Sequence, residues 1–266
     1  MDLAPLAERF GEHQVAAFML VLARLSPLFL LAPLFSSRSI PARAKSVAAV
    51  GLAIGMMPVA TRAAGGLDEL PADAIGFAGL VGKELLVGAG FAFVLAALFA
   101  AVSAAGALLD TMIGFSFGAL VDPLTGNTGG VLGQLYGLVA IAVFIVIGGD
   151  AWVVQGIART YDVVPLLEAP ELGPLVAGAA AATAGVLGAA VQVSAPVLLA
   201  LIITDAAVGV VSRVMPSLNV FAVGFPAKVA VGLVMIGASL PFAAGWLHDE
   251  LQASVAAALD ALEVSG

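Results

Sequence analysis

The residues of this chain that could do chemistry are ionisable side chains inside or beside long apolar segments. In a membrane protein such groups mark ion or substrate pathways, proton relays or structural ion pairs. Arg24 and the adjacent Lys83 and Glu84 lie well inside apolar segments. Four others lie at segment edges, where they reach water or lipid headgroups: Asp110, Asp150, Asp205 and Arg213. The pattern favours charge pairing between helices or subunits over transport, with these candidate partners: Arg24, Lys83, Glu84, Asp205 and Arg213.

No combination of residues predicts a catalytic centre, a cofactor site or a metal site. The sequence has no Ser-His-Asp arrangement, no phosphate-binding glycine loop and no histidine pair at helical spacing. The chain has no cysteine, which excludes a thiolate metal site, and its two histidines, His13 and His248, lie near its two ends. Because the net charge is −8 and the basic residues are few and scattered, nucleic-acid binding is not indicated.

The composition predicts an all-α integral membrane protein. Hydrophobic residues make up 62% of the 266 residues, charged residues make up 11%, and the mean hydropathy is +1.13. Soluble domains are about 45–50% apolar and about 25% charged. The apolar residues fall into six blocks: Gln14–Phe35, Ser46–Ala60, Ala74–Leu109, Gly129–Gly149, Leu172–Thr204 and Val229–Leu247. We expect about six long, partly kinked helices that form hairpins, within one membrane domain of residues 1–266. The acidic residues 1–13 do not resemble a cleavable signal, so the first segment is expected to be retained.

Two blocks have lengths that do not fit a simple bundle of spanning helices. A spanning helix needs roughly 20 residues, whereas Ser46–Ala60 is shorter and Ala74–Leu109 is far longer. The long block must either break or extend beyond the bilayer, and the sequence leaves both open. Leu172–Thr204 contains Pro196, which removes one helical hydrogen bond and favours a kink. The longest polar connection is expected at Asp150–Glu171.

Lysine and arginine gather at two connections, and this bias predicts orientation because cytoplasmic loops are enriched in basic residues. Arg38, Arg43 and Lys45 follow the first block, and Arg213 and Lys228 lie between the fifth and the sixth. Both connections are therefore expected in the cytoplasm, with both termini on the outer side. Arg38, Arg43 and Lys45 form a basic turn that is expected to lie near lipid headgroups.

One connection, DTMIGFSFGALVDPLTGNTGGVLG (Asp110–Gly133), is unusually apolar for a loop. Its first half contains these apolar residues and glycines: Met112, Ile113, Gly114, Phe115, Phe117, Gly118, Leu120 and Val121. Exposed loops are normally polar, so these side chains need another environment. The residues alone leave two readings open, an extension of the preceding helix packed on a neighbour and a separate apolar loop.

Three stretches, in order along the chain, resemble the FliR family of the flagellar type III export apparatus. They are LARLSPLFLLAPLFSSRSIPARAK (Leu22–Lys45), LLDTMIGFSFGALVDPLTGNTGGVLGQLY (Leu108–Tyr136) and QVSAPVLLALIITDAAVGVVSRVMPSLNVFAVGFPAKVAVGL (Gln192–Leu233). The resemblance covers most of Gln14–Leu247, and it is loose at the termini and at Asp150–Gly173. Virulence secretion systems have a related subunit, but the segments SSRSIPAR and MPSLNVFAVGFPAK look more flagellar.

The resemblance implies a protein without enzymatic activity in the bacterial inner membrane, within the flagellar basal body, with periplasmic termini. Such proteins join FliP and FliQ in a helical hetero-oligomeric assembly around a central channel, alongside FlhB and FlhA, and unfolded export substrates pass through it. Residues of about 14–159 would be a FliP-like portion, and residues of about 172–247 a FliQ-like hairpin. Asp205 and Arg213 would pair with each other or with FliQ. The excess length of the third block would be buried against partner subunits.

The family also implies a loop of this subunit that lies in the channel and helps to close it, and the matching positions are Met112–Val121. Apolar side chains do not hydrate an ion, and hydrophobic constrictions close channels by dewetting. Gly114 and Gly118 give this backbone freedom to move. The export-gate interpretation is favoured over two alternatives, a small secondary transporter that uses Arg24 and the Lys83–Glu84 pair, and a membrane scaffold with no pore role.

Overall fold

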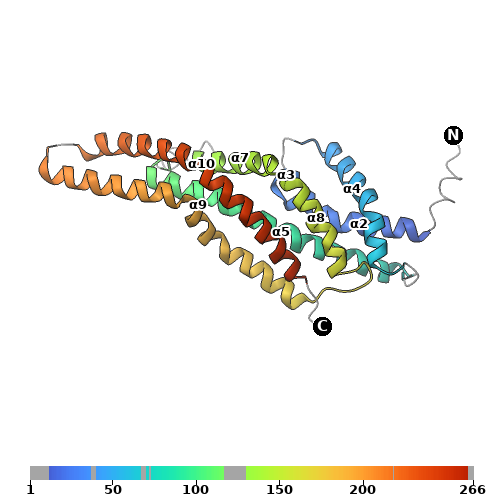
Figure 1. Cartoon of the computed structure of the whole chain (residues 1–266). Coiled ribbons are helices and arrows are strands. Elements are labelled where there is room, and N and C mark those ends of the chain that lie inside the picture. Colours follow the sequence, from blue (N-terminus) through green and yellow to red (C-terminus); the bar gives the residue numbers. More distant parts are fainter. Residues whose placement is uncertain are drawn as a thin grey trace. The chain divides into compact units, whose positions relative to one another are not determined.

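The computed structural model describes residues 12–36, 40–66, 70–71, 73–116, 130–217 and 219–262, and every regular element in these ranges is an α-helix (Figure 1). The helices are α2 (Glu12–Leu31), α3 (Pro33–Ser36), α4 (Ala42–Ala63), α5 (Ala74–Ile113), α7 (Val131–Val146), α8 (Gly149–Val163), α9 (Leu172–Val214) and α10 (Val220–Asp260). Five are long and apolar enough to cross a membrane, or six if the bent pair α7–α8 is one span. The expected all-α membrane class is confirmed.

The chain forms two compact units, and each unit is built from separate stretches of sequence. The first contains residues up to 96, residues 148–182 and residues from 252 onward. The second contains residues 97–147 and 183–251. Helices α5, α9 and α10 therefore each contribute to both units. The expected FliP-like and FliQ-like portions concern likeness to other proteins rather than contacts within this chain, and they stay a prediction.

Apolar side chains of α2 form much of the core of the first unit. Helix α2 packs against α3 and α4, and α4 packs against α8. Leu20, Leu25 and Leu28 of α2 are fully buried, as are Phe91 of α5 and Ile157 of α8. These positions recur at intervals of three to five residues along α2, so one face of that helix lies inside the unit.

The observed helices explain the two apolar blocks, Ser46–Ala60 and Ala74–Leu109, whose lengths do not fit a simple bundle of spanning helices. Helix α4 is 22 residues long because it extends beyond the apolar block at both ends, from Ala42 to Ala63. Helix α5 is one continuous helix of 40 residues, so the long block does not break. At about 1.5 Å per residue it is about 60 Å long, roughly twice the thickness of the hydrocarbon core of a bilayer. Helix α9 also continues through Pro196 to Val214.

The expectation of a polar connection at Asp150–Glu171 is wrong for residues 150–163, because α8 occupies Gly149–Val163. Gly148, between α7 and α8, has a left-handed backbone (φ 69°), a conformation that interrupts the helical path. Val153, Ile157 and Tyr161 are buried at a spacing of four residues. The charged residues of α8 lie on exposed positions: Asp150, Arg159 and Asp162. An amphipathic helix of this kind resembles a polar loop when only its average polarity is considered.

In the second unit, glycines bring the backbones of α5 and α7 close together. A Cβ atom at Gly106 of α5 would collide with the backbone of Leu132 and would lie 2.7 Å from the Cα of Gly133. One turn further along α7, a Cβ at Gly137 would lie 3.3 Å from the hydroxyl of Ser103. Small residues four apart allow such close packing of helices in membranes.

Helices α9 and α10 form an antiparallel hairpin in the second unit (Figure 1). The Trp246 indole N–H donates a hydrogen bond to Gln192 at 3.3 Å, and Lys228 forms an ion pair with Asp205. Residues of α10 thus meet residues of α9 in reverse order, as a hairpin requires.

We predict that Gly106→Ala destabilises the second unit by about 1–3 kcal/mol, because the new methyl group overpacks against the backbone of α7. A thermal unfolding midpoint measured in mild detergent checks this. Gly79→Ala is the matched control in the same helix, since nothing lies within 4 Å of a Cβ there. The midpoint of the control should be unchanged or higher, and an equal response of the two variants would contradict the prediction.

Candidate functional site

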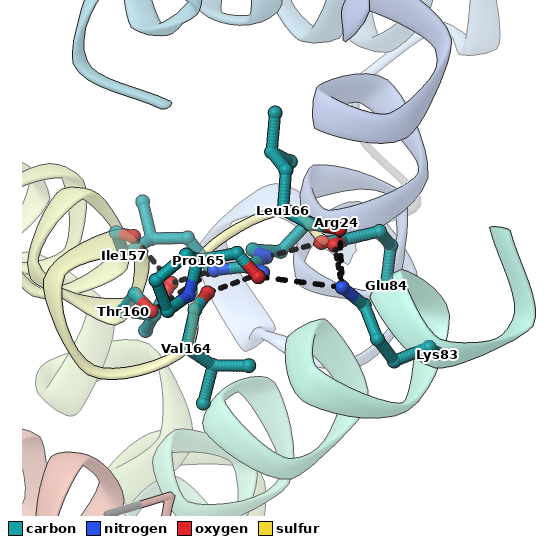
Figure 2. Close-up of polar contacts among 8 residues, drawn as sticks. All are labelled: Arg24, Lys83, Glu84, Ile157, Thr160, Val164, Pro165 and Leu166. Atoms are coloured by element: carbon teal, nitrogen blue, oxygen red, sulfur yellow. Dashed lines mark hydrogen bonds and ion pairs between the residues drawn. The ribbon is translucent and has the colours of Figure 1, made fainter. Parts of the chain in front are cut away.

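Arg24 of α2 lies at the centre of a buried polar network in the first unit (Figure 2). Its Nε donates to Glu84 Oε2 of α5 at 2.5 Å. Its Nη1 donates to the carbonyl oxygen of Thr160 at 3.0 Å and to the Thr160 hydroxyl at 3.2 Å. Its Nη2 donates to the carbonyl oxygen of Val164 at 2.8 Å. The ring of Tyr161 lies 4.2 Å from the guanidinium carbon, a cation–π contact.

Lys83 continues this network toward the connection that follows α8. Its Nζ lies 2.8 Å from Glu84 Oε1 as an ion pair. It also donates to the carbonyl oxygen of Pro165 at 3.3 Å and to that of Leu166. Figure 2 shows both cations pointing at the carbonyl groups between Thr160 and Leu166. The adjacent residues Lys83 and Glu84 thus fasten α5 both to α2 and to the end of α8.

The geometry of the network suits structural pairing rather than transport. Arg24 and Glu84 are both 0% exposed, and all three guanidinium nitrogens already donate hydrogen bonds to this chain. The carbonyl groups at the end of α8 are the negative end of the helix dipole, where a cation is stabilised. A transport site needs ligands that a substrate can reach, whereas Arg24 and Glu84 are closed off from solvent and the Arg24 nitrogens already donate to groups of this chain.

Asp110 closes the apolar connection between α5 and α7. Its carboxylate accepts hydrogen bonds from the backbone N–H groups of Leu132 and Gly133, each at 3.0 Å. These N–H groups belong to the first turn of α7, so they have no acceptor within their own helix. Asp110 is 1% exposed, so it caps α7 from inside the unit and holds the end of α5 beside the start of α7.

Helix α5 ends inside the apolar stretch that the resemblance assigns to a channel loop. Ile113 is the last helical residue, and Gly114 adopts φ 103°, a conformation that favours glycine. Ile113 is buried, whereas Met112 is 44% exposed. The ring of Phe115 meets that of Phe225 edge to face at 6.3 Å. The first two residues of the stretch therefore extend the helix, and the chain leaves the helical path at Gly114.

Other residues selected from the sequence lie in several places. Arg38 and four members of the expected loop lie outside the described residues: Phe117, Gly118, Leu120 and Val121. Arg43 is exposed in the first turn of α4, and Lys45 donates to the carbonyl oxygen of Ser36 at 2.9 Å. Asp205 forms its ion pair with Lys228, and Arg213 is exposed at the end of α9. Among the described residues, no group of three or more metal-ligating side chains is placed to hold an ion.

Sequence reasoning missed the backbone carbonyl groups and the Tyr161 ring that contact Arg24 and Lys83. The carbonyl groups of Thr160, Val164 and Leu166 carry no signal in the sequence because every residue has one. Tyr161 could have been found from its spacing of four residues from Ile157, which marks the buried face of α8.

We predict that Arg24→Met lowers stability strongly, by about 3–5 kcal/mol, because it leaves Glu84 buried with a single charged partner. The double variant Arg24→Met/Glu84→Leu should lose less than the sum of the two single variants. Thermal unfolding in mild detergent measures this, with the exposed Arg43→Met as the control. If Arg24→Met unfolds at the same temperature as Arg43→Met, the network does not stabilise the fold.

Comparison with known proteins places the chain in a family. The family described as "Bacterial export proteins, family 1" matches residues 15–254. The flagellar biosynthetic protein FliR of Bacillus subtilis is 32% identical over 83% of this chain and 84% of its own length. FliR of Escherichia coli is 26% identical over 84% of each chain. The surface presentation of antigens protein SpaR of Salmonella typhimurium is 25% identical over 85% of this chain and 83% of its own length. The chain therefore belongs to the FliR family of bacterial export proteins.

Proposed function

We propose that this chain is a structural, channel-forming subunit of the flagellar type III protein export gate, without enzymatic activity, in which an apolar loop helps to seal the pore. The observation that carries the sealing role is the end of α5. An apolar helix turns out of its path at Gly114 and leads directly into further apolar residues. A barrier of such side chains stops ions because it offers them no hydration.

The exposed apolar surface of the long helices supports an assembly with other membrane proteins. In the most apolar window of α9 only 28% of residues are buried, and in that of α10 only 17%. Large side chains on the hairpin face outward, among them Leu199, Ile203 and Val234. A helix about 60 Å long extends beyond the hydrocarbon layer, so lipid alone does not cover it. We propose FliP and FliQ as the subunits that cover these surfaces, with FlhB and FlhA adjacent.

The location that we propose is the bacterial inner membrane within the flagellar basal body. Arg43 and Lys45 begin α4, and Arg213 ends α9. Because basic residues favour the cytoplasmic side, we propose that the connection between α9 and α10 lies in the cytoplasm and that both termini lie in the periplasm. The end of α5 lies beside Lys228 near that same connection, and this agrees with a chain that crosses the membrane in alternate directions.

We predict that the tagged chain, co-expressed with its operon and purified in mild detergent, is recovered as one complex with several FliP and FliQ subunits. Intact-complex mass spectrometry measures the composition. The physical reason is that α9 and α10, with 43 and 41 residues, extend beyond the hydrocarbon layer, so lipid alone does not cover their exposed apolar side chains. Recovery as a lone monomer or homodimer, with both partners well expressed, would contradict the assembly and favour the alternative, a small secondary transporter using Arg24, Lys83 and Glu84.

We predict that replacing Phe115 and Phe117 by glycine, or deleting residues 114–118, raises the ion permeability of the assembled complex. Both changes remove apolar bulk from the proposed barrier, so water and ions enter more easily. Conductance of the purified complex in planar bilayers measures this, and co-purification shows that assembly persists. Exposed Val47→Gly in α4 is a control that also removes an apolar side chain. Unchanged conductance in an assembled deletion variant would contradict sealing and leave a scaffold role.

A further inference from the structure

The start of the apolar loop, Met112–Phe115, is held by one stripe of α10. Phe225, Lys228 and Gly232 are spaced by three and four residues, so they lie on one face of that helix. The Phe225 ring meets that of Phe115. The Lys228 ammonium lies 3.4 Å from the carbonyl oxygen of Met112. Gly232 makes room for Ile113, because a Cβ atom there would collide with that side chain. We call Met112–Phe115 the loop root.

The turn at Gly114 explains why the Met112 carbonyl oxygen is within reach of a lysine. In an uninterrupted helix the N–H group of Ser116 would point at this oxygen. Here the Ser116 N–H donates instead to the carbonyl oxygen of Asp110, at 3.4 Å. Met112 O is thus one of the last carbonyl groups of α5, at the negative end of the helix, where a positive charge is favourable.

Asp205 of α9 holds the same lysine from the other side. Asp205 Oδ1 lies 2.6 Å from Lys228 Nζ, with side chains that are 48% and 24% exposed. The carboxylate compensates the lysine charge and restricts its rotamers, which aims the ammonium at the loop root. The three parts come from three helices: a carboxylate on α9, an ammonium on α10 and a carbonyl group at the end of α5.

We propose that the Asp205–Lys228 ion pair is a latch that holds the loop root against α10 in the closed gate. Lys228 is the positioning residue, and Asp205 orients it. The inference rests on the proposed sealing role of the loop and adds the contact that regulates it. Because the ion pair is partly exposed, the free energy that it contributes is modest. A modest contribution suits a contact that has to open during export. The alternative is that the ion pair only joins α9 to α10 and does not hold the loop root.

A charge swap separates the latch from a simple link between the two helices. In Asp205→Lys/Lys228→Asp the ion pair between α9 and α10 can form again, but α10 no longer presents an ammonium to Met112 O. Its carboxylate would instead face that oxygen and repel it. A link between helices is therefore restored by the swap, whereas a latch stays broken.

The experiment measures the ion conductance of the purified complex with FliP and FliQ in planar bilayers. Lys228→Met should raise the conductance about two- to fivefold, the change in a closed–open equilibrium that a partly exposed ion pair supports. Lys228→Arg should stay near the unaltered protein, and the charge swap should leak as Lys228→Met does. Arg159→Met is the control, because it removes an exposed base that lies on α8, in the other unit. The deletion of residues 114–118 is the positive control.

Two outcomes overturn the latch while the sealing role stands: the deletion leaks but Lys228→Met does not, or the charge swap restores a tight gate. If the deletion itself does not leak, the proposed sealing role fails, and the latch fails with it. Should Lys228→Met reduce recovery of the complex, Asp205→Asn takes its place, since it removes the charge that orients the lysine. A tight gate in the assembled Asp205→Asn complex then overturns the latch.

Discussion

One charge without access to water, the guanidinium group of Arg24, determines how the first unit is built. Moving such an ion out of water has a penalty of several kcal/mol even after relaxation, and only close pairing with further hydrogen bonds offsets it. The partners come from Glu84 on α5 and from carbonyl groups at the end of α8, so three helices must meet at this point. Gly88 permits the approach, since a Cβ atom there would collide with the carbonyl oxygen of Arg24.

The second unit contains no comparable buried ion pair in its described part, and it joins helices by different means. Glycines bring the backbones of α5 and α7 together, and Asp110 caps α7 across that contact. The result is a firm support on both sides of the apolar connection. A loop that seals a channel needs such supports, because its closed position is reproducible only when its ends are held. The ion pair between Lys228 and Asp205 is partly exposed, whereas the Asp110 cap of α7 is buried.

The sequence predicts the membrane class, the apolar segments and the charged residues of the buried network, Arg24, Lys83 and Glu84. These residues are easily recognised because an arginine or glutamate inside an apolar segment is rare. The sequence does not predict which groups meet. Arg24 and Glu84 are 60 residues apart, and the carbonyl groups that complete the network have no signature. Helix α8 was concealed by the charges on its exposed face, and the role of Asp110 by its distance from the helix that it caps. The long α5 is visible in the sequence as an excess of apolar residues, but composition alone does not show whether such a segment breaks or continues as one helix.

The interleaved arrangement of the two units has a consequence for synthesis. Multidomain chains usually fold from the N-terminus, one unit at a time. Here Leu262, which follows α10, packs in the first unit with Val87 and Val164, while residues 183–251 of the second unit come between them in the sequence. All residues up to Leu262 must therefore leave the ribosome before the first unit is complete. Val87 and Val164 are synthesised, and the α9–α10 hairpin is inserted, before Leu262 is available to pack against them. The first unit therefore begins earlier in the chain than the second unit but is completed later.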